Sequence, residues 1–93
     1  MPHFKIAHLR EQGQNMIIVP LESSFGHRSD DDQRATIAEL QERARGAGLA
    51  GTVVPVWQSG GRMYSIAPNP WRSFFQSLSM QRVILNINKE LYW

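Results

Sequence analysis

The residues of this chain best suited to catalysis are a proline beside the start and three histidines. Removal of Met1 would leave Pro2 with a secondary amine at the chain terminus, and such an amine acts as a general base when it is desolvated. His27 lies in a polar stretch and is a second candidate, since histidine side chains change charge near neutral pH. His3 and His8 are five residues apart, which places them on opposite faces of a strand. They are not expected to act as a pair.

Residues 23–29 and the three acids that follow them are candidates for binding an ion. This segment lies between a predicted strand and a predicted helix, where backbone N–H groups and the helix dipole attract anions. Its spacing matches no known phosphate loop, and Asp30, Asp31 and Asp32 would repel a phosphate. Consecutive helical residues point about 100° apart, so the three carboxylates do not converge on one cation. Because the chain also has no cysteine, we expect no metal, cofactor or disulfide.

Aromatic and arginine side chains are the candidates for binding. Trp57 lies at the end of a predicted hairpin arm, and Tyr92 and Trp93 lie at the C-terminus, where exposed rings could anchor a partner. Arg62 and Tyr64 lie on the second arm of that hairpin and could contact a protein or a nucleic acid. The formal net charge of +2 is too small to decide between these partners.

The elements that must position these residues begin with two strands and a helix. Residues 3–10 alternate loosely between apolar and polar, which predicts an edge strand. Residues 16–21 are apolar on both faces, which predicts a central strand. Ser29 or Asp30 can cap a helix that opens with three aspartates and ends near Gly46.

The second half of the chain predicts a hairpin, a helix and a last strand. Residues 52–57 and 62–67 form the hairpin arms around a turn with two glycines, and Pro55 places the first arm at a sheet edge or a bulge. Pro70 suits the first position of a helix. Residues 82–88 alternate and predict the final strand. The buried face of the second helix is expected to carry Trp71, Phe74, Phe75 and Leu78.

From residue 16 onward the expected order is strand, helix, strand, strand, helix, strand. This order resembles that of ferredoxin-like folds, which implies an α+β two-layer sandwich with a mostly antiparallel sheet, here with an extra N-terminal strand. With 93 residues, of which 42% are hydrophobic, we expect a single domain over residues 1–93. The longest aliphatic run is far shorter than the roughly 20 residues of a membrane helix. A soluble cytoplasmic protein without a membrane segment is therefore expected.

Two further resemblances concern function. The block that contains Trp57, Gly60 to Met63, Ile66 to Trp71 and Phe74-Phe75 is similar to small bacterial proteins of about this length that have no assigned function. That resemblance implies no catalytic residue. Pro2 together with residues 30–37 looks distantly like tautomerases with an amino-terminal proline. In that family the helix follows the first strand almost at once, and its substrate-binding arginines match no residue here.

Three function classes follow from these observations. The leading hypothesis is a non-catalytic interaction module that forms a homodimer or binds another protein through an open sheet face or an edge strand. The alternative is a nucleic-acid-binding domain, because ferredoxin-like folds include RNA-recognition domains, although only Tyr64 offers a ring for base stacking here. The third is a small-molecule enzyme that uses Pro2 or His27 as its base.

Overall fold

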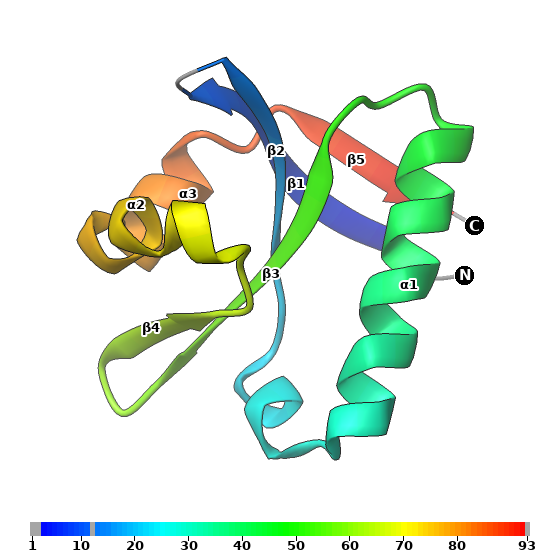
Figure 1. The fold of residues 1–93 in the computed structure, drawn as a ribbon. Coiled ribbons are helices and arrows are strands. Elements are labelled where there is room, and N and C mark those ends of the chain that lie inside the picture. The colour runs from blue at the N-terminus through cyan, green and yellow to red at the C-terminus, as the bar shows by residue number, and fades with distance from the viewer. Residues whose placement is uncertain (1–2, 12, 93) are drawn as a thin grey trace.

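The computed structural model describes residues 3–11 and 13–92 and shows an α+β fold built on a five-stranded sheet (Figure 1). Its strands are β1 (His3–Glu11), β2 (Gln14–Pro20), β3 (Thr52–Ser59), β4 (Arg62–Ser65) and β5 (Lys89–Tyr92). The α-helices of the described residues are α1 (Asp30–Gly46), α2 (Arg72–Ser77) and α3 (Met80–Leu85), and the 3-10 turns are η1 (Ser23–His27) and η2 (Asn69–Trp71). None of these helices has the length and apolar character that crossing a membrane requires.

The sheet has the order β4-β3-β2-β1-β5 and is mostly antiparallel. β1 pairs antiparallel with both β2 and β5, and β3 pairs antiparallel with β4. β2 and β3 run parallel, because α1 carries the chain from the end of one to the start of the other. The prediction that β1 is an edge strand is wrong, since it lies between β2 and β5. The edges of the sheet are β4 and β5.

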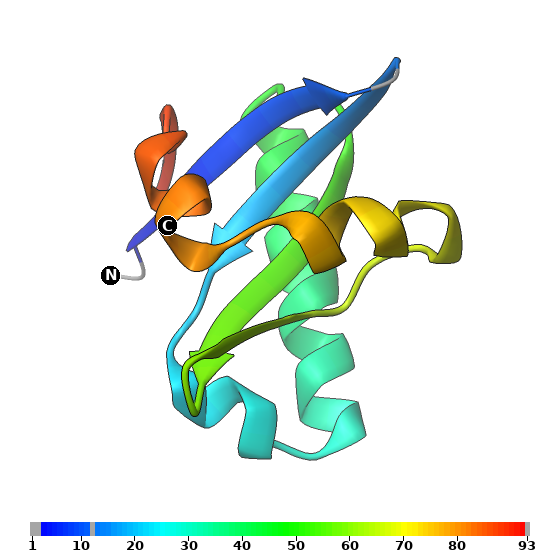
Figure 2. The same ribbon diagram turned by 90° about the vertical axis from the view of Figure 1, so that its left-hand side faces the viewer.

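Helices cover both faces of this sheet. α1 packs on one face, where Leu40 and Ile17 belong to one buried apolar cluster. α2 and α3 pack on the opposite face, where Phe75 and Val83 share a second cluster with Ile18. Figure 2 shows α2 and α3 in front of the sheet and α1 behind it. β2 contributes to both clusters, so the central position predicted for this strand is confirmed.

The ferredoxin-like arrangement is not confirmed. Along the chain from β2, strands and helices follow one another much as expected. In space, however, β2 lies directly beside β3, whereas a split βαβ arrangement separates the two parallel strands by another strand. The helices also lie on two faces instead of one, so helices pack on the face that a two-layer sandwich would leave open.

The final strand predicted over residues 82–88 is wrong, because most of that segment belongs to α3. Ser79 caps this helix, with its Oγ accepting a hydrogen bond from the backbone N–H three residues on (3.3 Å). Val83 is buried against the sheet, whereas Ile84 and Leu85 are 55% and 75% exposed. The last strand, β5, begins only at Lys89.

Pro55 lies in an interior strand with regular register, and not at an edge or a bulge as predicted. The backbone N–H of Ile66 donates to the Pro55 carbonyl (3.2 Å). Because the N and the C=O of one strand residue point to the same side, the Pro55 nitrogen also points toward the β4 side. β4 ends at Ser65, before this point, so the missing N–H removes no bond from the regular ladder.

Local signals in the sequence correctly predicted α1 and the β3–β4 hairpin. Ser29 caps α1, its Oγ accepting from the Asp32 N–H (3.2 Å), and the helix ends at Gly46. Gly60 and Gly61 form the hairpin turn with φ values of +59° and +79°, which glycine adopts without strain. Caps and turns depend on a few adjacent residues, and for this reason the sequence predicts them well.

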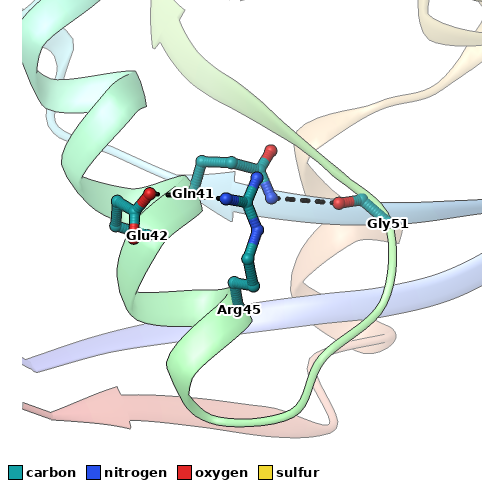
Figure 3. Close-up of polar contacts among 4 residues, drawn as sticks. All are labelled: Gln41, Glu42, Arg45 and Gly51. Carbon is teal, nitrogen blue, oxygen red and sulfur yellow. Dashed lines mark hydrogen bonds and ion pairs between the residues drawn. The ribbon is translucent and has the colours of Figure 1, made fainter.

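One side chain of α1 joins the helix to the chain that enters β3. Gln41 donates from Nε2 to the Gly51 carbonyl (3.0 Å), as Figure 3 shows, and accepts at Oε1 from the Val53 N–H (2.9 Å). Both bonds are partly buried, so each stabilises the fold by about 1 kcal/mol. The ion pair between Arg45 and Glu42 on the same helix (3.4 Å) joins side chains that are 69% and 74% exposed, and it contributes little.

Candidate functional site

The edge strand β4 presents unpaired backbone groups. In an antiparallel ladder, hydrogen-bonded and non-hydrogen-bonded pairs alternate. The bond from Ile66 N–H to the Pro55 carbonyl fixes the phase of this alternation. Counting back from Ile66, the N–H and C=O groups of Met63 and Ser65 point away from β3 and toward the free side of the strand. An edge of this kind can pair with another extended chain.

An open groove follows this edge between β4 and the pair α2–α3, which lie on the same side of the molecule (Figure 1). Its larger part has a volume of about 960 Å³ and is lined by β4, the chain between α2 and α3, and α3 itself. A smaller part of about 410 Å³ is lined by β4, the residues after it, and α2. Met63, Tyr64 and Gln76 line both parts, so the two adjoin.

Exposed apolar side chains gather at this groove. In the described part of the chain the large hydrophobic residues that are exposed are Tyr64, Ile66, Ile84, Leu85 and Tyr92. Ile84 and Leu85 line its larger part and Ile66 its smaller part. Tyr64 borders both parts, but its ring stacks on Trp57 on the other face of β4, and Tyr92 lies elsewhere. Contiguous exposed apolar surface marks binding sites more often than scattered residues do.

The surroundings of the groove carry positive charge. Arg62 lines the larger part and Arg72 the smaller part, and both side chains are exposed. Arg82 is exposed on α3. Among the described residues that line the groove there is no acidic side chain. The sequence has no Asp or Glu between Glu42 and Glu90, so this whole half of the chain is basic.

An aromatic row supports β4 from the face that α1 covers. Tyr64 stacks on Trp57 of β3, with ring centroids 6.1 Å apart and planes 18° apart. Trp57 in turn meets Phe25 of η1 edge to face at 5.2 Å. Gly26 permits this approach, because a Cβ at that position would overlap the indole Nε1. Trp57 is therefore half-buried and holds Tyr64 in place, and it is not the exposed anchor that the sequence suggested.

Of the sequence candidates that lie in the described residues, the structure brings three together. Trp57, Arg62 and Tyr64 are neighbours in the β3–β4 hairpin. His27 is exposed at the end of η1. Tyr92 lies on β5, at the opposite edge of the sheet. Pro2 and Trp93 lie outside the described residues.

A polar cluster surrounds Tyr92 on β5, at the sheet edge opposite the groove. Its ring stacks on His3 of β1 at 4.6 Å, its hydroxyl donates to Glu90 Oε2, and His3 Nε2 lies 3.1 Å from the same oxygen. The hydrogen bond from Tyr92, followed by that from His3, holds the pKa of the Glu90 carboxyl below its usual value. The bond to Glu90 raises the pKa of the Tyr92 hydroxyl.

Replacing Glu90 with glutamine should lower the pKa of Tyr92 back toward its ordinary value of about 10. The physical reason is that a neutral amide no longer favours the protonated phenol. In the wild type, the Glu90 contribution to stability is present above the unfolded carboxyl pKa and is lost as pH falls through the lower folded value. The Tyr92 contribution is full below its unfolded pKa and is lost as pH rises through the raised folded value.

The pKa of Tyr92 can be followed by NMR from its ring resonances as pH is raised. Glu11→Gln is the matched control, since it makes the same change at the far end of β1 from His3, the residue that pairs with Tyr92. An unchanged Tyr92 pKa in the Glu90 variant would show that the two side chains are not bonded in solution.

No protein-family model, no curated protein and no solved structure matches this chain. Among the described residues no group of three histidine or acidic side chains is placed to hold a metal ion. The function is therefore inferred from the geometry and chemistry of the groove.

Sequence reasoning missed the α3 side of the groove. Ile84 and Leu85 line it, but the strand predicted over residues 82–88 would have pointed these two neighbouring side chains to opposite faces of the sheet. The signal that could have found them is Ser79, a good cap residue followed directly by methionine, glutamine and arginine, which all favour helix.

Proposed function

We propose that this protein binds an extended segment of another polypeptide, which adds as a strand beside β4. The main support for this proposal is that the free edge of β4 lies directly beside an apolar groove. Met63 and Ser65 present backbone donors and acceptors to the partner, and the groove beside them receives its side chains. Strand addition combines these two elements, since main-chain bonds supply affinity and alternate side chains supply specificity.

The exposed apolar side chains give this binding its driving force. Ile84 and Leu85 are 55% and 75% exposed and lie on the wall of the groove that faces away from the core. A bound segment would remove them from water, at roughly 25 cal/mol for each Å² of apolar area covered. The same burial would occur in a homodimer through β4. Pairing two copies there would, however, bring the basic surroundings of two identical grooves together, which disfavours self-association.

Selection from a random peptide library tests this function, with a matched pair of variants at Ser65. Ser65→Pro removes the N–H that points to the free edge, and proline is tolerated at such edge positions. Ser65→Ala keeps that N–H and differs by one hydroxyl. We expect peptides selected by the wild type to bind the proline variant about tenfold more weakly, as the loss of one such hydrogen bond implies, and to bind the alanine variant as the wild type.

Two controls make this test decisive. The amide NMR spectrum of each variant shows whether the β3–β4 hairpin is retained. Equal binding of the selected peptides to the proline and alanine variants would contradict strand addition at β4.

RNA binding is the second candidate function, because one specific observation favours it. Arg62, Arg72 and Arg82 are exposed in a region without acids, and Tyr64 is a partly exposed ring beside them. Bases bind by stacking on exposed aromatic faces, and one face of Tyr64 already stacks on Trp57. The aliphatic lining of the groove suits peptide side chains better than bases.

A further inference from the structure

We infer that the polypeptide bound beside β4 is acidic, with carboxylate side chains alternating with apolar ones. This inference rests on the proposed function and adds the chemistry of the partner. Strand addition fixes the alternation, because successive side chains of the added strand point to opposite faces of the sheet. The two faces beside β4 differ in chemistry, so each selects a different kind of side chain.

The face toward α2 and α3 selects apolar side chains. Met63 belongs to the buried cluster on that face, and it lines the groove together with Leu78, Met80 and Ile84. A side chain of the added strand that points to this face enters the groove beside Met63. A carboxylate among these apolar side chains would lose part of its hydration, whereas an aliphatic group would gain contacts.

The face toward α1 selects carboxylates. Arg62 and Tyr64 alternate with Met63 along β4, so their side chains lie on this opposite face. Directly opposed side chains of neighbouring strands have Cβ atoms about 5 Å apart, within reach of an ion pair with Arg62 and of a hydrogen bond from the Tyr64 hydroxyl.

The charge distribution extends this preference along the groove. Arg72 lines the smaller part, at the end of β4 away from the hairpin turn, so a cation stands near each end of the strand. The described residues of the lining include no carboxylate that would neutralise these guanidinium groups. An acidic segment would therefore meet positive charge near both ends of β4, whereas a basic segment would be repelled.

The experiment compares three fluorescent peptides of equal length, in which valine alternates with glutamate, with glutamine or with lysine. Fluorescence anisotropy measures the affinity of each for the wild type. We expect the glutamate peptide to bind about tenfold more tightly than the glutamine peptide, and the lysine peptide to bind most weakly. Added salt should reduce the advantage of the glutamate peptide, because these ion pairs are exposed to solvent.

A matched pair of double variants locates the charge effect. In Arg62→Gln with Arg72→Gln, the glutamate peptide should bind about tenfold more weakly while the glutamine peptide is unaffected. The control is Arg10→Gln with Arg34→Gln, which changes net charge equally at two exposed arginines on β1 and α1. The control should bind both peptides as the wild type does, within about twofold.

The outcomes separate the partner chemistry from the function itself. Equal binding of the glutamate and glutamine peptides, each weakened by Ser65→Pro, would overturn the acidic partner and leave strand addition standing. If none of the three peptides binds and the library selection yields no binder, both the acidic partner and strand addition are overturned.

Two other occupants of the groove, a second copy of this chain and RNA, would give different experimental results. A dimer of the free protein that Ser65→Pro dissociates would identify a second copy of this chain as the partner and overturn the inference. Oligouridine that binds more tightly than the glutamate peptide, with sensitivity to the Arg62 and Arg72 changes but not to Ser65→Pro, would identify RNA and overturn it as well.

Discussion

Replacing Gly51 with alanine should destabilise the protein by about 3 kcal/mol, enough to remove much of the stability of a small domain. Gly51 has a φ of +127°, a conformation that side-chain-bearing residues rarely adopt. A Cβ there would lie 2.6 Å from the carbonyl oxygen of Asn15, which is backbone and cannot rotate away. Moving either chain would disturb the adjacent register pair Met16 and Thr52, and the bond that Gln41 donates to the Gly51 carbonyl.

Gly48→Ala is the matched control for this prediction. Gly48 also has a positive φ, +79°, but a Cβ there meets no atom within 4 Å. It should cost only about 1 kcal/mol, the penalty of the left-handed conformation alone. Urea unfolding at equilibrium measures both variants. A Gly51 variant no less stable than the Gly48 variant would contradict the close approach of the α1–β3 connection to β2.

Replacing Phe75 with alanine should cost about 3 to 5 kcal/mol and also abolish binding in the groove. Phe75 is 4% exposed and packs in the cluster that holds Ile18 and Val54. α2 has only six residues, too few to be stable without tertiary packing. Loss of this ring should release α2 and with it one wall of the smaller part of the groove, which Phe75 itself lines.

Leu85→Ala separates stability from binding. Leu85 is 75% exposed, so its truncation should change the free energy of unfolding by less than about 0.5 kcal/mol. It lines the groove, however, and the same change should weaken binding of the alternating glutamate–valine peptide. Urea unfolding and peptide anisotropy on the two variants test both statements. A Leu85 variant that is strongly destabilised would show that α3 packs differently from the arrangement described.

The candidate site was only partly predictable from the sequence. The types of Arg62 and Tyr64, and the hairpin that carries them, predict contact residues, and both line the groove. Trp57 was placed in the right hairpin but with the wrong exposure, because its contact with Phe25 joins segments more than thirty residues apart in the chain. No local sequence pattern predicts a contact between residues so far apart in the chain. Ile84 and Leu85 were missed altogether, since alternation in residues 82–88 fits a strand as well as a short helix.

Local sequence signals were enough to predict where most of the elements begin and end and that β2 is a central strand. Ser29, the three aspartates, Gly46, Gly60 and Gly61 act on the backbone within a few residues of themselves, so their effect does not depend on the rest of the fold. Long-range packing, in contrast, sets the position of β2 beside β3, the placement of helices on opposite faces, and the position of β4 at an edge. These choices depend on which apolar surfaces bury one another, and an apolar helix face such as that of α2 can pack on either side of a sheet. The groove exists because of those long-range choices.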